Sequence, residues 1–153
     1  MSMANAGGIT DRDDPVDLAR FICAQDKVYA DVLAELRGGQ KLTHWMWFIF
    51  PQIEGLGHSP TTRHYSIKGL EEARLYLAHP VLGLRLKECT EAVLAVQGQK
   101  AADIFGHPDD WKLQSSMTFF ELVSEPQSIF GRVLEKYYQG KRDARTLQIV
   151  GKP

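Results

Sequence analysis

The sequence has almost no net charge and only two cysteines. Its 18 Lys and Arg residues nearly balance its 19 Asp and Glu residues, which gives a formal net charge of −1. Without a broad positive field, the chain lacks the attraction that draws proteins to nucleic-acid phosphates or anionic membranes, so we expect neither partner. Cys23 and Cys89 lie within apolar helical patterns rather than in a short paired spacing. That usage is typical of a reduced, cytoplasmic protein.

Long hydrophobic runs and targeting signals are also missing. The longest apolar run covers residues 45–50, which is far shorter than the roughly 18 residues that a membrane-spanning helix needs. No charged and then apolar leader precedes a cleavage site of small residues. Both absences favour a soluble protein of the cytoplasm.

The familiar motifs of metal binding and catalysis are absent as well. The five histidines form no His-Glu-x-x-His pattern, and the chain has neither Cys-x-x-Cys nor a calcium loop, so we expect no metal and no cofactor. Neither a Gly-x-Ser-x-Gly elbow nor a Gly-Lys-Ser/Thr phosphate loop occurs. The motifs therefore leave open whether the protein is an enzyme.

Strand patterns are missing, whereas helical patterns are abundant. No segment alternates between polar and apolar residues, and apolar residues recur at three- and four-residue intervals. We predict an all-α fold, a single compact domain of six to eight helices and no sheet over residues 14–150, preceded by a disordered tail at 1–13. The predicted helices cover 15–37, 44–50, 69–78, 80–97, 109–123, 125–140 and 143–150, with a turn at 101–105 and a loop at 51–66. Thr43 is expected to cap the interior helix 44–50.

Five polar residues fall where the helical pattern calls for apolar ones: Gln25, Arg85, Lys112, Ser115 and Ser116. Buried polar groups need partners. Gln25 either holds a loop carbonyl in the core or touches a ligand, and Arg85 either reaches a carboxylate or water or binds an anion. Lys112 lies either on an exposed helix face or in a site, and the two serines either bond back to the preceding turn or act as nucleophiles. Their coincidence on three helices favours a shared pocket.

The most distinctive stretch places the aromatic run 45–50 directly before a polar loop with two glycines. An aromatic wall beside a polar loop is a common way to build a small-molecule pocket. Such a loop either wraps a phosphate with its amides and side chains or is an ordinary capped surface loop. The ligand-binding residues predicted from this stretch are Trp45, Trp47, Gln52, Gly55, Gly57, Ser59, Arg63 and Tyr65.

One histidine is a candidate for acid–base chemistry. His44 stands almost alone among apolar neighbours, which predicts an interior histidine. Facing the loop, it would be the best general acid or base available, because an unperturbed histidine has a pKa of about 6.5. If the protein is an enzyme, we expect hydrolysis or transfer at a phosphorylated or glycosidic centre. The predicted roles are proton transfer by His44 or Asp110, charge stabilisation by Lys112 or Arg85, and substrate positioning by Ser116.

Several strings resemble a known family. They are His44-Trp45-Met46-Trp47-Phe48-Ile49-Phe50-Pro51-Gln52, Gly55-Leu56-Gly57, Ala73-Arg74-x-Tyr76-Leu77-x-His79-Pro80-x-Leu82-Gly83 and Lys112-Leu113-x-Ser115-Ser116-Met117-Thr118. From about residue 17 to residue 147, the chain resembles DUF1810, a family of uncharacterised small bacterial and fungal proteins. The resemblance implies a single, wholly helical domain and supplies no activity. It marks the same segments that the helical pattern singles out.

Two functions fit these observations. The leading hypothesis is a cytoplasmic protein that binds an anionic, partly aromatic small molecule, such as a nucleotide or an ADP-ribose-like metabolite. Its cleft is expected where helix 44–50, the loop 52–66, Arg85 and helix 109–123 converge. The alternative is a non-enzymatic adaptor that binds other proteins through an exposed helix face. Homo-oligomers are compatible with either function.

Overall fold

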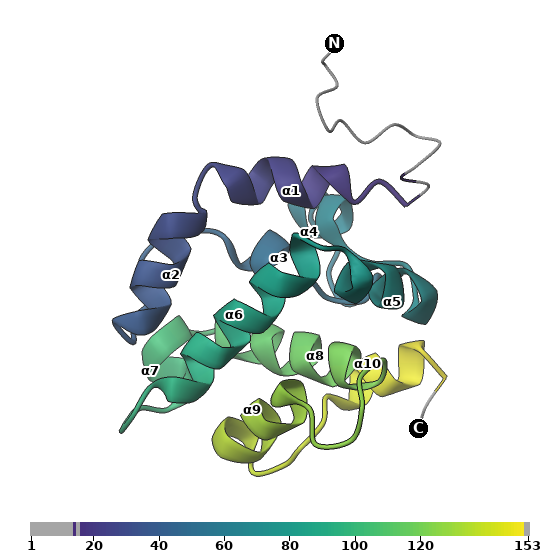
Figure 1. The fold of residues 1–153 in the computed structure, drawn as a ribbon. Coiled ribbons are helices and arrows are strands. Elements are labelled where there is room, and N and C mark those ends of the chain that lie inside the picture. Colours follow the sequence, from purple (N-terminus) through teal and green to yellow (C-terminus); the bar gives the residue numbers. More distant parts are fainter. Residues whose placement is uncertain (1–13, 15, 152–153) are drawn as a thin grey trace.

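The computed structural model describes residues 14 and 16–151, and these residues form ten helices and no strand (Figure 1). The helices are α1 (Ala19–Asp26), α2 (Tyr29–Arg37), α3 (Met46–Ile49), α4 (Pro60–Tyr65), α5 (Leu70–Ala78), α6 (Leu82–Ala95), α7 (Ala101–Phe105), α8 (Asp109–Glu121), α9 (Ile129–Tyr138) and α10 (Ala144–Ile149). The all-α prediction is confirmed for these residues, although the helices outnumber the six to eight expected. The predicted tail at 1–13 lies outside the described residues.

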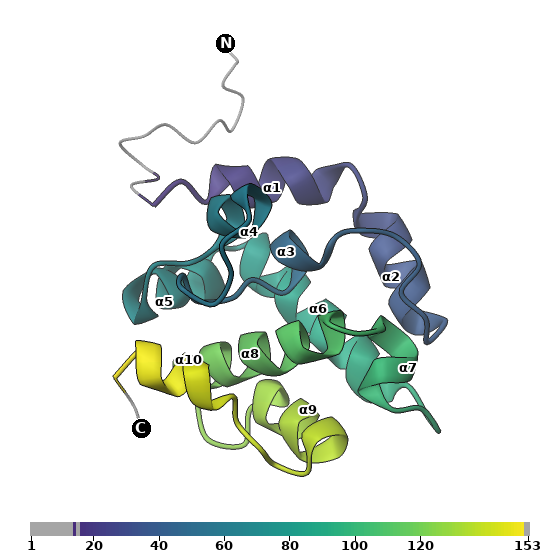
Figure 2. The same cartoon turned by 180° about the vertical axis from the view of Figure 1, so that it is seen from behind.

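Two helices organise the packing. The central α6 lies against α2, α5 and α9, while α8 lies against α5, α7, α9 and α10 (Figures 1 and 2). The largest fully buried side chains are Trp45, Tyr76, Phe21, Phe50, Phe119, Phe120, Phe130, Leu36, Met46, Ile67, Leu82 and Leu86. These side chains come from α1, α2, α3, α5, α6, α8, α9 and the segment before α5. A single hydrophobic core therefore joins the N-terminal helices to the C-terminal ones.

The predicted helix 15–37 is in fact two helices. Val28 leaves the helical region, with φ −132° and ψ 0°, and so separates α1 from α2. The break lets each half bury its apolar face on a different partner, because α1 packs against α3 whereas α2 packs against α6. A single straight helix would reach only one of these partners.

Two more helices occur where a loop and a turn were expected. Within the predicted loop 51–66, Ser59 caps α4 by accepting a hydrogen bond from the Thr62 amide, and Pro60 occupies the first helical position. The predicted turn at 101–105 forms α7. With the split at Val28, these two helices account for the excess over the prediction.

The helix expected at 44–50 is shorter than predicted. It begins after Trp45, and Thr43 does not cap it. Instead, the Thr43 amide and hydroxyl donate to the carboxylate of Glu35 in α2, at 3.0 and 2.7 Å. Nowhere in the described chain is a helix both long enough and apolar enough to cross a membrane.

Candidate functional site

A cleft of about 450 Å³ opens between α8, α10 and the segment 52–62. We call it the α8–α10 cleft. It is lined by Gln52, Leu56, Gly57, Thr62, Pro108, Trp111, Lys112, Gln114, Ser115, Asp143 and Arg145. Its volume lies within the roughly 300–1,000 Å³ of small-molecule pockets. Four of the residues predicted to bind a ligand or take part in catalysis therefore share it: Gln52, Gly57, Lys112 and Ser115.

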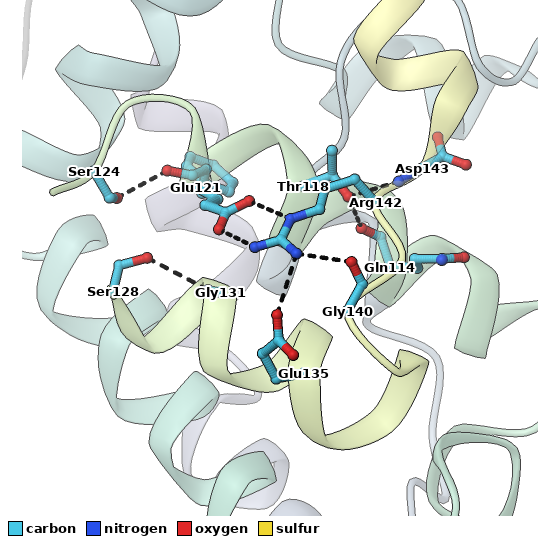
Figure 3. A network of polar contacts seen from close by, with 11 residues as sticks. Gln114, Thr118, Glu121, Ser124, Ser128, Gly131, Glu135, Gly140, Arg142 and Asp143 are labelled. Carbon is cyan, nitrogen blue, oxygen red and sulfur yellow. Dashed lines mark hydrogen bonds and ion pairs between the residues drawn. The ribbon is translucent and has the colours of Figure 1, made fainter. Parts of the chain in front are cut away.

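The C-terminal wall of the cleft is fixed by Arg142, which joins α8 to α9 (Figure 3). Its guanidinium contacts both carboxylate oxygens of Glu121, with the Nε–Oε1 distance at 2.9 Å, and donates to the Gly140 carbonyl at 2.7 Å. A second carboxylate, Glu135, lies 3.4 Å from Nη1. Hydrogen bonding to Glu121 is the main reason that the pKa of Arg142 is raised above its ordinary value. The connection between α9 and α10 is thus held against both helices.

The next residues along this connection are tied to α8 as well (Figure 3). Gln114 donates its amide to the Lys141 carbonyl at 2.9 Å, and the Asp143 amide donates to the Thr118 hydroxyl at 2.9 Å. Asp143 then caps α10, and its Oδ2 accepts from the Thr146 amide at 3.0 Å. Because α10 starts from this anchored carboxylate, the first turn of α10, which includes Arg145, is placed at the edge of the cleft.

Ser115 connects the two helices inside the cleft. Its hydroxyl lies 3.1 Å from the Trp111 carbonyl, one turn earlier, and 3.2 Å from Oδ2 of Asp143. The back-bonded alternative for Ser115 is therefore confirmed. Oδ2 of Asp143 thereby contacts three donors, while Oδ1 contacts none within the described residues.

Lys112 supplies one positive charge to the cleft. Its Nζ lies 3.4 Å from Oδ1 of Asp109, and 5.3 Å from the centre of the Trp47 ring. Asp109 also holds Lys41, whose Nζ lies 3.0 Å from Oδ2. Since Asp109 keeps Lys41 as a partner, Lys112 can turn toward an anion in the cleft without leaving Asp109 unpaired.

Arg145 supplies the second positive charge. It is exposed and forms no ion pair with any described residue. Its only hydrogen bond among these residues is a long one, 3.5 Å, to the carbonyl of Gly55. Gly55 has a φ of 109°, which favours glycine. Arg145 is therefore free to bind an anionic group.

Trp111 forms the rim of the cleft. Its side chain is 63% exposed, and it is the bulkiest of the exposed hydrophobic side chains among the described residues. The His107 ring meets it edge-on, with ring centroids 4.2 Å apart. An indole held at the rim offers a flat surface on which a ring can stack.

Gln25 and Arg85 lie elsewhere, in a polar network between α1 and α6. Gln25 is 1% exposed and donates to the Phe48 carbonyl at 2.7 Å and to the Tyr76 hydroxyl at 3.1 Å. Arg85 lies 2.8 Å from Oδ1 of Asp26 and also donates to Gln25. Gln25 is therefore an amide of the core that holds a backbone carbonyl. Arg85 is a guanidinium paired with a carboxylate. The expectation that Arg85 converges with helix 109–123 in one cleft is wrong.

The residues proposed for a reaction are not brought together. His44 is exposed rather than interior, because the chain enters α3 only after Trp45. Ser116 is fully buried, and its hydroxyl has no hydrogen-bond partner among the described residues. Oδ1 of Asp110 lies 3.0 Å from Nδ1 of His107. None of these three predicted residues lines the α8–α10 cleft.

The predicted ligand-binding residues of the aromatic run and of the loop also lie in different places. Trp45 is buried in the core, whereas Trp47 and Tyr65 line a shallow hollow together with Pro60. Ser59 is used as the cap of α4, and Arg63 is exposed and outside the α8–α10 cleft. Ser59 thus acts as an ordinary helix cap, while Gln52 and Gly57 of the same loop line the α8–α10 cleft.

Comparison with known proteins places the chain in a family. A family model described as "Protein of unknown function (DUF1810)" matches residues 15–150. The chain belongs to the DUF1810 family. The resemblance noted in the sequence is thereby confirmed. No match was found among the curated proteins.

A solved structure supports the DUF1810 fold. It is the crystal structure of the conserved hypothetical protein Rv1873 from Mycobacterium tuberculosis, which is 51% identical in sequence. The match covers 90% of this chain and 99% of that chain, with a TM-score of 0.89.

Seven residues that line the α8–α10 cleft were missed by the sequence analysis: Leu56, Thr62, Pro108, Trp111, Gln114, Asp143 and Arg145. Trp111 and Gln114 left a signal, because both fall on or near the polar sector of their helix, where a tryptophan has no core to enter. Asp143 could also have been noticed, because Asp is a typical N-cap residue and a helix was predicted to begin there. Arg145 left no signal, because its neighbour Gly55 lies far away in the sequence.

The lining of the cleft combines charged, aromatic and hydrogen-bonding groups. It offers two cations, a stacking surface and several hydrogen-bonding groups, and its one carboxylate is already held by three donors. The Ser115 hydroxyl contacts a carbonyl and a carboxylate rather than a base such as histidine. No group of three His, Cys, Asp or Glu side chains that could hold a metal ion occurs among the residues described.

Proposed function

We propose that this DUF1810 protein binds a small anionic metabolite that carries a flat ring, of the nucleotide type, in the α8–α10 cleft. The observation that carries the proposal is that Lys112, Arg145 and Trp111 line the same cleft. Two cations and an indole are the groups that recognise an anion attached to a ring. With the Asp143 carboxylate counted, the lining of the cleft keeps an excess of one positive charge, which favours an anionic ligand.

Each of these side chains has a distinct part in binding. Arg145 can hold two oxygens of a phosphate or carboxylate at once, because its guanidinium presents paired donors. Lys112 adds a point charge from the facing helix. Trp111 covers one face of the ring, and burial of that face removes apolar surface from water.

The uncharged polar groups of the cleft would set the orientation of the ligand. Gln52 comes from the segment before α4 and Ser115 from α8, so their side chains approach from opposite walls. Gly57 leaves the backbone accessible in the same wall. A few placed polar groups beside an aromatic surface are the usual composition of a small-molecule site.

A thermal-shift panel tests the proposal. Nucleotides, nicotinamide compounds and sugar phosphates are added separately to the full chain. A ligand at about a hundred times its dissociation constant stabilises the folded state by ~2.7 kcal/mol, which raises the melting temperature by roughly 5–10 °C for a domain of this size. Melting curves that stay flat for every compound would overturn the proposal.

Matched variants locate the site. Arg145→Ala and Lys112→Ala should each abolish most of the shift, because each removes a charge from the cleft. Lys68→Ala is the control, since Lys68 is exposed and lies outside every cleft described. Equal loss of the shift in all three variants would contradict binding in this cleft.

The protein-interaction alternative has one observation in its favour, which is the same exposed indole. An exposed aromatic side chain rimmed by polar residues is also typical of protein interfaces. The panel separates the two functions, because an adaptor gives no shift with any small molecule.

A further inference from the structure

A second cleft lies on the other side of Trp111. It has a volume of about 460 Å³ and opens between the start of α7, the C-terminal end of α9 and α8. We call it the α7–α9 cleft. Its lining residues are Gln99, Lys100, Ala101, Ala102, Asp110, Trp111, Gln114, Lys136, Tyr137, Tyr138 and Gln139. Trp111 and Gln114 line both clefts.

The helix geometry of α8 explains why Trp111 separates the clefts. Successive residues of an α-helix are turned by about 100°. Asp110 and Gln114 therefore lie on one flank of Trp111, while Ser115 and Lys112 lie on the other. The first two line the α7–α9 cleft, and the last two line the α8–α10 cleft. The exposed indole is the ridge between two hollows of nearly equal volume.

The two clefts carry matching charges. The α8–α10 cleft has two cations, Lys112 and Arg145, and one carboxylate, Asp143. The α7–α9 cleft also has two cations, Lys100 and Lys136, and one carboxylate.

In both clefts the carboxylate is already engaged. In the α8–α10 cleft, Oδ2 of Asp143 accepts from Ser115 and Thr146. In the α7–α9 cleft, Oδ1 of Asp110 is held by His107 at 3.0 Å. On each side, one cation has no ion pair among the described residues: Arg145 in the α8–α10 cleft and Lys100 in the α7–α9 cleft.

The cations of the α7–α9 cleft are held in different ways. Lys136 is fixed by its Nζ, which donates to the carbonyls of Leu94 and Val96, the former at 2.7 Å. Lys100 is exposed and forms no ion pair with the described residues. The α7–α9 cleft therefore has one lysine held by backbone carbonyls and one lysine without an ion pair among the described residues.

From this arrangement we infer that the two clefts form one bipartite site for a nucleotide with phosphate groups on both sides of its nucleoside. The inference rests on the proposed function and names the class of ligand more closely. The ring lies against Trp111, one phosphate meets Lys112 and Arg145, and the second phosphate meets Lys100 and Lys136. A monophosphate would leave one pair of cations unused.

The test compares two probes, adenosine 5′-monophosphate and adenosine 3′,5′-bisphosphate, by titration calorimetry on the full chain. With two more cations engaged, the bisphosphate should bind about tenfold more tightly than the monophosphate at low salt. This ratio of dissociation constants should fall in 0.5 M salt, where the Debye length shrinks and exposed charges are screened.

Substitutions at Lys100 locate the second phosphate. Lys100→Ala should lower the ratio of the two dissociation constants to about threefold, and Lys100→Glu should bring it to about one or below. Lys68→Ala removes the same charge from a position outside both clefts and should leave the ratio at about ten.

The outcomes separate the inference from the proposed function. A wild-type ratio near one, or a ratio that Lys100→Glu does not change, overturns the bipartite site while monophosphate binding that depends on Arg145 still supports the proposed function. No binding of either probe overturns both.

Discussion

The indole Nε1 of Trp45 donates a hydrogen bond of 2.9 Å to Oε1 of Glu35, and thereby links α3 to α2. The same carboxylate accepts from the amides of Leu42 and Thr43 and from the Thr43 hydroxyl. Four donors on one carboxylate fix the whole connection between these helices. The segment 42–45, which leads into α3, is thus held by the side chain of Glu35.

Replacement of Glu35 by Gln should therefore destabilise the fold. The substitution keeps the size of the side chain but removes its charge, and hydrogen bonds to a charged acceptor are stronger than neutral ones. We expect a loss of about 1–2 kcal/mol, or roughly 2–8 °C in melting temperature. Glu71→Gln is the control, because the side chain of Glu71 is 78% exposed and its ion pair contributes little. Equal melting temperatures for both variants would contradict the role of Glu35.

The contribution of Glu35 should depend on pH. Burial alone would raise the pKa of this carboxyl, but the hydrogen bonds from Thr43, Leu42 and Trp45 outweigh it and lower the pKa from 4.5 to about 2. A lowered pKa in the folded state stabilises the protein fully above the unfolded pKa, and this stabilisation is lost as the pH falls toward the folded one. The melting-temperature difference between wild type and Glu35→Gln should stay constant from pH 7 to 5 and narrow below about pH 4.5.

The neighbouring serines of α8 should respond in opposite ways to truncation. Ser116→Ala removes a buried hydroxyl that has no partner among the described residues, so stability should stay within about 0.5 kcal/mol or increase. Ser115→Ala removes two hydrogen bonds and should cost about 1 kcal/mol. Urea unfolding measures both. A larger loss for Ser116→Ala than for Ser115→Ala would show that the hydroxyl of Ser116 has a partner.

The sequence predicted the helical fold well where apolar spacing and caps agree, and poorly where packing decides. Helix 69–78 was predicted nearly residue for residue. The break at Val28 could not be, because the apolar spacing continues across it and no glycine or proline marks it. The start of α4 could have been found, since Ser59 before Pro60 is a typical cap followed by proline.

The site was predicted only in part, for a related reason. Helical periodicity correctly identified Gln25 as a polar residue in the core, but could not tell that its partner is the Phe48 carbonyl. It placed Lys112 and Ser116 on one stripe, but only Lys112 lines the cleft, whereas Ser116 is buried. The opposite wall depends on how α10 docks on α8, and that docking is set by contacts such as Asp143 with Thr118 between distant segments.

The turn between α5 and α6 leaves no room for a side chain at Gly83. A Cβ there would overlap the backbone carbonyl of Leu77, and a backbone atom cannot move aside as a flexible side chain does. Gly83→Ala should cost about 3 kcal/mol or more. Gly69→Ala is the matched control, because the backbone of Gly69 is extended and no atom lies within 4 Å of its Cβ position. Chemical denaturation should show a change of less than about 0.5 kcal/mol for the control.

Arg142→Lys should loosen the connection between α9 and α10. Lysine cannot contact both oxygens of Glu121 and the Gly140 carbonyl at once, so we expect a loss of about 1–2 kcal/mol. The amides of Asp143 and Thr146 should also exchange with deuterium faster, because they depend on that connection. Arg132→Lys, at an exposed position without an ion pair among the described residues, is the control. Unchanged exchange in Arg142→Lys would contradict this role.

The exposure of Trp111 gives the protein an optical reporter of its own. Of the three tryptophans in the chain, Trp45 is 1% exposed and Trp111 is 63% exposed. An indole surrounded by water emits at longer wavelengths than an enclosed one and is open to dissolved quenchers. The fluorescence of the unlabelled protein therefore contains a component from Trp111. A ligand that covers this indole should shift that emission to shorter wavelengths.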